Sequence, residues 1–393
     1  MLLDYTQASM STYTADCSGV ASALYELGGM TVIHDASGCN STYATHDEPR
    51  WTSMPSAVYI SALLEMDAVL GNEDKVVDDI VKTVRDITPA FVAIAGTPIP
   101  TMTGVDLKSI ATRVETQTGT PSFALATNSM RPYSFGAAMS WIELARRFTD
   151  TTVCSPSRDI NLMGVTPLDF SMGTLLDSLF IAADRAGFSV NACWAMRSTL
   201  EDLSRTLAAR VNVVVSASGL PLAQFYEVRF GMPYVVGLPI GDLAPRWEQA
   251  IRFAITRRRS VPLGDFLGKD PGGSRIAVIG EPLQAACVAA ANNLTSPGST
   301  RALSVLPTLG ADAPILTSDL SEDTLREQLR ASTVMLGDPL FNIIAKEADC
   351  RRCVSFPHEA CSGRWYTDHV VDTINGETFR SLQHALCSTN LSE

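Results

Sequence analysis

Residues 30–43 read MTVIHDASGCNSTY, and this stretch indicates the class of fold. Its first part, residues 30–33, is a continuous apolar run, which is typical of a strand buried on both faces of a parallel sheet. The run ends in a loop of small polar residues that presents Cys39 directly after a glycine. The stretch therefore predicts a buried strand whose following loop carries a thiol.

The same unit of strand and helix recurs along the chain. Apolar runs that end in Gly, Pro, Ser or Thr are followed by helical patterns, and these runs cover residues 91–95, 122–126, 160–164, 211–215, 234–237, 275–280 and 334–338. One intervening segment, residues 74–87, places Val and Ile side chains on one face at helical spacing. Strands that alternate with helices predict an α/β fold of doubly wound, Rossmann-like domains with mostly parallel sheets.

Two breaks in this pattern suggest domain boundaries. One lies at residues 150–159 and the other is the Gly- and Pro-rich stretch at residues 268–273, and a new strand pattern follows each. A chain of 393 residues is also too long for one ordinary core. We therefore predict three α/β domains at residues 1–155, 156–270 and 271–393, with chemistry in the loops that follow the strands.

Composition and charge argue against several classes of function. The chain carries 30 Lys and Arg residues against 42 Asp and Glu residues, and this net charge of −12 argues against a nucleic-acid groove. The N-terminus lacks the pattern of a secretory signal, and no apolar run approaches the roughly 20 residues of a membrane span, so we expect a cytoplasmic protein. No P-loop sequence is present and no GxGxxG follows a strand, so we expect no nucleotide bound by this chain.

Cys17 and Cys39 are the first candidates for chemistry. Cys17 lies in a small polar segment just before a helical pattern, and a thiolate at a helix start is stabilised by the free amides there, which also suits a metal ligand. The separation of the two cysteines is much longer than the spacing of a zinc ribbon. Each could equally be an unliganded core thiol, because free cysteine is commonly buried.

The order of several short segments resembles the nitrogenase component 1 family. These segments are Cys17 in its small-residue loop, HDASGC ending at Cys39 with Tyr43 after it, AGTP at residues 95–98 with TGVDL at 103–107, NLMG at 161–164, RFGMPY at 229–234, and Gly280-Glu281 after a strand. The family includes nitrogenase catalytic subunits, related cofactor-assembly scaffolds, dark-operative protochlorophyllide and chlorophyllide reductases, and the nickel-sirohydrochlorin a,c-diamide reductive cyclase.

The resemblance implies that Cys17 and Cys39 bind a 4Fe-4S cluster at a subunit interface. The position of the family's usual third cysteine is Thr97 here, and a neutral hydroxyl is a poor iron ligand. A symmetric homodimer would bring two thiolates from each chain and complete the four ligands that such a cluster needs. With a homologous but different partner chain, Asp16 or Asp35 could serve as oxygen ligands. The alternative is that this chain has lost the cluster.

A second departure from the family concerns the substrate. The nitrogenase catalytic subunit holds its metal cofactor through a cysteine after the strand that resembles residues 211–215, and here Ser216 follows that strand. The resemblance therefore implies a small molecule or tetrapyrrole as substrate rather than N2. A metal cofactor bound by other residues is the alternative.

The C-terminal cysteines allow two interpretations. Cys350, Cys353 and Cys361, with His358 between the last two, could hold zinc or another iron-sulfur centre. The simpler interpretation, which we favour, places Cys353 in a buried strand with Cys350 merely adjacent, because C-x-x-C alone is a weak signal. His358 and Glu359 lie in the loop after that strand, and we expect them to be catalytic through substrate contact or proton delivery. His34 is expected to orient the Cys39 loop.

The resemblance implies the catalytic component of a two-component, ATP-dependent reductase. A separate iron-protein-like ATPase would dock on the dimer and deliver electrons through the interface cluster to the substrate. A scaffold that holds a metallocluster or tetrapyrrole precursor for assembly or transfer is the alternative, and a cluster-free binding protein is a third hypothesis. Reductant-dependent turnover with the ATPase would distinguish the enzyme from the scaffold.

Overall fold

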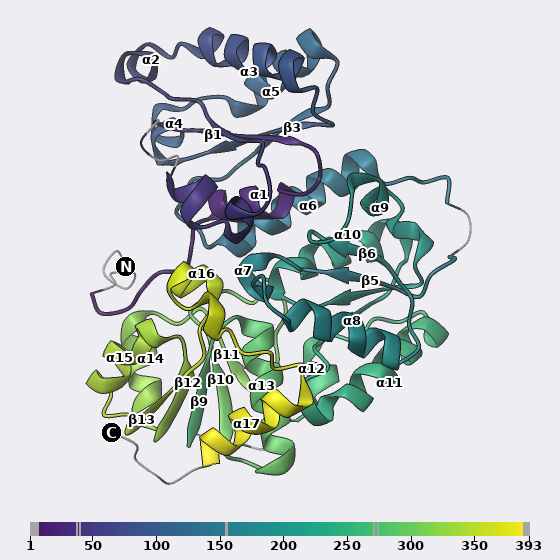
Figure 1. Ribbon diagram of the computed structural model, residues 1–393, viewed down its shortest axis with the longest axis vertical. Coiled ribbons are helices and arrows are strands. Elements are labelled where there is room, and N and C mark those ends of the chain that lie inside the picture. The colour runs from purple at the N-terminus through teal and green to yellow at the C-terminus, as the bar shows by residue number, and fades with distance from the viewer. Residues whose placement is uncertain are drawn as a thin grey trace.

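The computed structural model describes residues 8–36, 38, 41–153, 156–269, 272 and 275–387. Its strands form three separate sheets in which every pair of neighbouring strands is parallel. Each sheet is flanked by helices, and the three units meet around α7 and α16 (Figure 1). The α/β fold with parallel sheets is therefore confirmed. The predicted boundaries lie at residues outside this description, so the division at 155 and 270 stays a prediction.

The first unit has a four-stranded sheet of order β2-β1-β3-β4. Alternate residues of β1 and β3 point to opposite faces, so that Ile33 and Ala93 pack towards α1 and α6 while Val32 and Ile94 pack towards α3 and α5. The elements are β1 (Met30–His34), β2 (Val58–Ile60), β3 (Val92–Gly96), β4 (Ser122–Leu125), α1 (Asp16–Leu24), α2 (Glu65–Leu70), α3 (Glu73–Ile87), α4 (Pro98–Thr103), α5 (Leu107–Thr118) and α6 (Tyr133–Phe148).

The second unit has a sheet of order β6-β5-β7-β8. Its central strands β5 and β7 are buried along their whole length, and each holds one buried asparagine, Asn161 or Asn212, among its apolar residues. The elements are β5 (Ile160–Met163), β6 (Val190–Trp194), β7 (Val211–Val214), β8 (Tyr234–Val236), α7 (Pro167–Phe170), α8 (Leu175–Arg185), α9 (Leu200–Ser204), α10 (Leu220–Phe230), α11 (Ala244–Arg257) and α12 (Leu263–Leu267).

The third unit has a five-stranded sheet of order β11-β10-β9-β12-β13. The strand that contains Cys353 is β13, and it lies at the edge of the sheet with partly exposed side chains. The prediction that this strand is buried is therefore wrong, because an edge strand has a neighbour on one side only. The elements are β9 (Ile276–Ile279), β10 (Thr300–Leu303), β11 (Leu316–Thr317), β12 (Val334–Gly337), β13 (Arg352–Ser355), α13 (Pro282–Thr295), α14 (Glu322–Arg330), α15 (Asn342–Glu347), α16 (Glu359–Ser362) and α17 (Gly376–Cys387).

Two glycines set the contact between α1 and α6. A Cβ atom on Gly19 would lie 2.0 Å from the carbonyl oxygen of Tyr133, and one on Gly136 would lie 1.8 Å from that of Asp16. Both distances are far below ordinary contact distance, so the two backbones can approach this closely only because neither glycine has a side chain. The crossing fixes the first turn of α1, which contains Cys17, against the start of α6.

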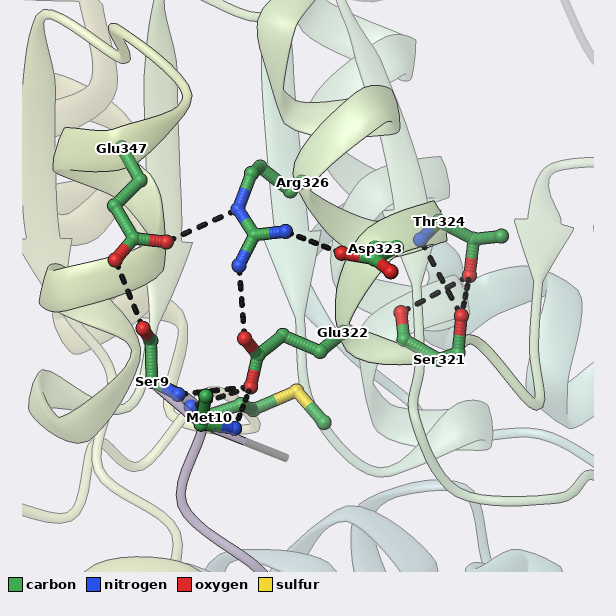
Figure 2. Close-up of polar contacts among 9 residues, drawn as sticks. Ser9, Met10, Ser321, Glu322, Asp323, Thr324, Arg326 and Glu347 are labelled. Carbon is green, nitrogen blue, oxygen red and sulfur yellow. Dashed lines mark hydrogen bonds and ion pairs between the residues drawn. The ribbon is translucent and has the colours of Figure 1, made fainter. Parts of the chain in front are cut away.

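The segment before α1, residues 8–15, crosses from the first unit to the third, and we call it the N-terminal strap (Figure 1). At its far end the carboxylate of Glu322 accepts hydrogen bonds from the backbone N–H groups of residues 8–10, at 2.8 to 2.9 Å (Figure 2). Arg326 holds that carboxylate from the other side and also pairs with Glu347 at 3.0 Å. Across the described part of the chain, no helix is long and apolar enough to cross a membrane.

Candidate active site

Cys17 lies in the first turn of α1 and is closed off from solvent. Its thiol donates a hydrogen bond to the carbonyl of Gly96 at 2.9 Å and accepts one from the hydroxyl of Ser129 at 3.2 Å. Burial raises the pKa of the Cys17 thiol to about 12, although the Ser129 hydrogen bond acts in the opposite direction. Burial therefore opposes the thiolate that a helix start is expected to favour, and the role of Cys17 as a metal ligand stays a prediction.

Asp16, the neighbour of Cys17, fixes the loop that follows β4. Its carboxylate accepts the backbone N–H groups of Asn128 at 3.2 Å and Ser129 at 2.8 Å, and its own N–H donates to the carbonyl of Arg131. Burial raises the pKa of Asp16, and the two N–H groups oppose that effect. Asp16 therefore serves as a structural acceptor, and its oxygens are already engaged.

The described residues do not fit an iron-sulfur cluster held by this chain alone. Thr97 is fully buried, and its hydroxyl donates to the carbonyl of His34 at 3.0 Å, so that it presents no soft ligand. Among the residues that the structure describes, no group of three His, Cys, Asp or Glu side chains could hold a metal ion. Cys39 lies outside the described residues. His34 itself bonds to Ser61 at 2.7 Å, and its proposed effect on the Cys39 loop stays a prediction.

A cavity of about 600 Å³ lies between the N-terminal strap, the first unit and the third unit. Its wall includes Tyr13, Ser129 and Arg131 and, from the third unit, Ala360 and Cys361. Ser129 is the residue whose hydroxyl contacts the Cys17 thiol, so one side of the cavity lies directly over the candidate redox residue.

The segment at residues 42–52, which contributes to the wall of the cavity, is tied to α1 by a buried arginine. Arg50 has no exposed surface, and its guanidinium bonds to Glu48 at 2.7 Å, Glu26 at 2.9 Å and the carbonyl of Ser22 at 2.6 Å. Its pKa is raised, since the two carboxylates outweigh the opposing effect of burial. This network positions Asp47, which directly precedes Glu48 in the chain and lines the cavity.

A second group of polar residues lies where the three units meet, and we call it the junction cluster: Tyr13, Tyr133, Asp169, Glu281 and His358. The Tyr133 hydroxyl donates to Oδ1 of Asp169, and Nε2 of His358 lies 3.6 Å from the same oxygen. The rings of Tyr13 and His358 meet edge to face with their centroids 5.3 Å apart. The cluster thus draws on the strap, α6, α7, the start of α13 and the loop before α16.

The junction cluster is electrostatically unusual because it buries two carboxyl groups together. Glu281 caps α13 and accepts the N–H groups of Ala217 at 2.7 Å and Gln284 at 2.8 Å. Burial and then the negative charge of Asp169 raise the pKa of Glu281, the N–H groups and His358 oppose this, and the net result is a pKa of about 7. The pKa of Tyr133 is also raised well above 10, first by burial and then by Asp169.

The two predicted catalytic residues face different surroundings. Both ring nitrogens of His358 are buried and have no hydrogen-bond partner among the described residues, while its backbone N–H donates to Asp338 at 2.8 Å. Glu359 accepts the hydroxyls of Ser171 at 3.1 Å and Thr367 at 2.8 Å, and burial raises its pKa. The structure therefore places His358 in the junction cluster and directs Glu359 towards α7 and the loop after α16. Their catalytic roles stay a prediction.

Four members of the junction cluster were not proposed as functional residues from the sequence, although Glu281 lies in a segment that carries the family resemblance. Asp169 and Glu281 each follow a buried strand closely, so the rule that ligands bind at the carboxyl ends of parallel strands could have indicated them. Tyr13 and Tyr133 carry no such signal, because nothing local in the sequence shows that the strap and the start of α6 reach the third unit.

The remaining candidates offer no metal site within the described residues. The hydroxyl of Ser216 donates to the carbonyl of Gly164 at 2.7 Å and also bonds to Ser218. Cys350 is buried with its thiol 3.7 Å from the carbonyl of Arg352, and burial raises the pKa of the thiols of Cys350, Cys353 and Cys361. The structure gives no support to a zinc site at these three cysteines.

The chain thus combines three parallel sheets with a buried acidic junction and a cysteine in the first turn of α1. The sequence pattern of the family described as nitrogenase component 1 type oxidoreductase matches residues 18–245, and the chain belongs to this family. The structure entitled nitrogenase Cp1 at pH 6.5 has a TM-score of 0.68 at 15% identity and covers 97% of this chain and 93% of that one. That likeness shows the fold.

Two curated relatives are light-independent protochlorophyllide reductase subunits B. The protein from Prosthecochloris aestuarii is 30% identical over 129 residues, which are 32% of this chain and 24% of that protein. The protein from Picosynechococcus sp. is 26% identical over 196 residues, which are 47% of this chain and 39% of that protein. The chain therefore spans well under half the length of these relatives.

Proposed function

We propose that this chain is the catalytic component of a nitrogenase-like, two-component reductase that acts on an organic small molecule or a tetrapyrrole rather than on N2. A separate ATP-dependent component would supply the electrons. Membership of the family and the similarity to subunits of light-independent protochlorophyllide reductase support this class of reaction.

The observation that carries the proposal is the position of the cavity. Ser129 lines it and contacts the Cys17 thiol, while Tyr13 lines it and contacts His358. Reduction of an organic double bond needs both electrons and protons, and here one cavity borders both a thiol and an acid-base cluster. Its volume of about 600 Å³ lies in the range of roughly 300 to 1,000 Å³ that is common for small-molecule sites.

The chain's own residues would bind the substrate and supply protons. Arg131 at the cavity wall can pair with an acidic substituent, since its side chain is partly exposed. His358 is proposed as the group that passes a proton towards the cavity. Glu359 would hold the start of α16 through its two hydroxyl contacts and would also contact the substrate.

We propose that a partner chain completes the redox site. Cys17 and Cys39 would form half of a 4Fe-4S cluster, with the other half supplied by a second copy or a homologous chain. Of these two ligand thiols, only that of Cys17 lies within the described residues. An exposed apolar face on the first unit supports an interface with another protein; it comprises Leu64, Met66, Val69 and Leu70 around α2 and Met102 in the adjacent α4.

The first experiment is to measure iron and acid-labile sulfide in protein purified without oxygen. We expect about two irons per protomer in a dimer, lost in Cys39→Ser and retained in Cys387→Ser, a matched control at an exposed cysteine. Absence of iron from the wild type, or iron that survives Cys39→Ser, would exclude the shared cluster.

Turnover separates the enzyme from the scaffold. Protochlorophyllide would be incubated with the protein, ATP, a reductant and a nitrogenase-like ATPase component, and each of these would be omitted in turn. Reduction that requires all of them supports the enzyme. Transfer of an intact bound cofactor to another protein without turnover would instead identify the scaffold.

A further inference from the structure

Unpaired polar atoms gather around the junction cluster. The hydroxyl of Tyr13 and both ring nitrogens of His358 are buried without a hydrogen-bond partner among the described residues, as are the nearby hydroxyls of Thr14 and Ser134. Leaving a buried polar atom without a partner costs about 1 to 3 kcal/mol of folding free energy. Several such atoms at one place therefore indicate that bound water satisfies them or that they take part in proton transfer.

A second, much smaller cavity lies on the inner side of the same cluster. It has a volume of about 10 Å³ and is lined by Asp169 and Glu281 together with Ser216, Gln284 and Thr373. The buried hydroxyl of Thr373 has no partner among the described residues. This volume is about the minimum that holds one water molecule. The rest of the wall is apolar, so that such a water would bond to these polar side chains.

Asp169 is the central residue of the arrangement. Its Oδ1 receives the Tyr133 hydroxyl and faces Nε2 of His358 at 3.6 Å, and its Oδ2 receives the hydroxyl of Thr166 at 3.2 Å. The same residue lines the small cavity that it shares with Glu281. Asp169 thus lies between the inner carboxyl group and the histidine, and Tyr13 continues the series from the histidine to the 600 Å³ cavity.

The charges around Glu281 favour one shared proton. The titratable groups that influence or surround it come from every element at the junction: Asp169 on α7, His358 before α16, Tyr133 on α6, Tyr13 on the strap, Cys287 on α13, and Asp338 and Cys361 beside Tyr13. Apart from His358, none of these groups can be positive. Two carboxylates that are buried together without a permanent cation cannot both be ionised at low cost, so one of them retains a proton.

We propose that Asp169 and Glu281 share one proton through a bound water, and that His358, whose ring packs against Tyr13 at the wall of the large cavity, passes this proton towards that cavity. Its use in catalysis rests on the proposed function. Reduction of one C=C bond to CH–CH takes two electrons, supplied by the separate reductase component, and two protons. One of these protons would leave the shared site through His358, and the other would come from a water molecule in the large cavity. Solvent water would then reprotonate the shared site, so that each reduction releases two hydroxide ions to solvent. Glu281 is in this scheme a proton store and not a catalytic residue.

The test is a pH titration of the substrate-free protein by infrared difference spectroscopy. We expect a protonated-carboxyl band at neutral pH that shifts when the protein contains isotope-labelled glutamate and is lost in Glu281→Gln. In Asp169→Asn the band should titrate at lower pH, because the neighbouring charge is gone. Glu322→Gln is the matched control, since that carboxylate has a lowered pKa, and it should leave the band unchanged.

A wild-type protein without such a band, or with one that ignores the glutamate label, would overturn the shared proton even if the variants fail to fold. The experiment needs neither iron nor substrate. A band that is present in a protein without reductase activity would therefore refute the proposed function alone, and reductase activity without the band would refute this inference alone.

Discussion

Replacing Gly136 with alanine should separate the two helices that hold the Cys17 turn in place. The new methyl carbon would lie 1.8 Å from the carbonyl oxygen of Asp16. Since ordinary contacts between heavy atoms begin at about 3.5 Å, α1 and α6 must move apart by roughly 1.7 Å. The obstacle is backbone, which cannot rotate away as a side chain can.

The expected loss of stability is about 3 kcal/mol. Overpacking of this kind costs up to about 3 kcal/mol, and the shift of Asp16 away from the 128–131 loop weakens hydrogen bonds worth about 1 kcal/mol each. Against this, alanine is favoured over glycine in a helix by about 1 kcal/mol. The balance leaves the variant clearly destabilised.

Urea unfolding followed by circular dichroism would measure this effect. Gly173→Ala is the matched control, because a Cβ atom at Gly173 meets no atom within 4 Å and should change stability by less than about 0.5 kcal/mol. If Gly136→Ala and Gly173→Ala unfold at the same urea concentration, the close crossing of α1 and α6 is refuted.

Two further substitutions test the elements that border the cavity. Burial alone would raise the pKa of Glu322, but the N–H groups of the strap and Arg326 outweigh burial and lower that pKa. The carboxylate therefore stabilises the fold at pH values above its unfolded pKa of about 4.3. This stabilisation is lost as the pH falls and the carboxylate is protonated. Glu322→Gln should therefore cost about 1 to 2 kcal/mol at neutral pH and much less near pH 3, as measured by urea unfolding at both pH values, and an equal cost at both would contradict the strap contact. Arg50→Met leaves Glu48 buried without its partner and should cost about 3 to 5 kcal/mol in thermal unfolding, whereas a loss below about 1 kcal/mol would show that the pair is dispensable.

Most of the sheet architecture could be predicted because parallel strands leave a local signal. Strands such as β3, β5 and β7 are buried on both faces, so each appears as an apolar run that ends in turn residues. The strands absent from that series are less distinctive. Edge strand β2 has three residues and β11 has two, and β6 begins with half-buried residues. Such segments become strands because they pair with neighbouring strands in the sheet, and their own sequences show no distinctive strand pattern.

The candidate site was predicted in part for the same reason. Cys17 and His358 attract attention as chemically distinctive residues in loops or at helix ends, and both border the cavity or the junction cluster. The direction of the Cys17 pKa could not be predicted, because the effect of a helix start depends on how much water remains around the thiol.

The sequence by itself determined the alternation of strands and helices and the three parallel sheets, since periodicity and turn residues act over short distances along the chain. The family followed from the order of its short segments. Only the tertiary structure decided that Tyr13, Tyr133, Asp169, Glu281 and His358 form one cluster, because these residues are as much as 345 positions apart, counted from 13 to 358, and meet only where three separately formed units pack together. Their burial, and with it the raised pKa of Glu281, is a property of that packing and not of any one segment.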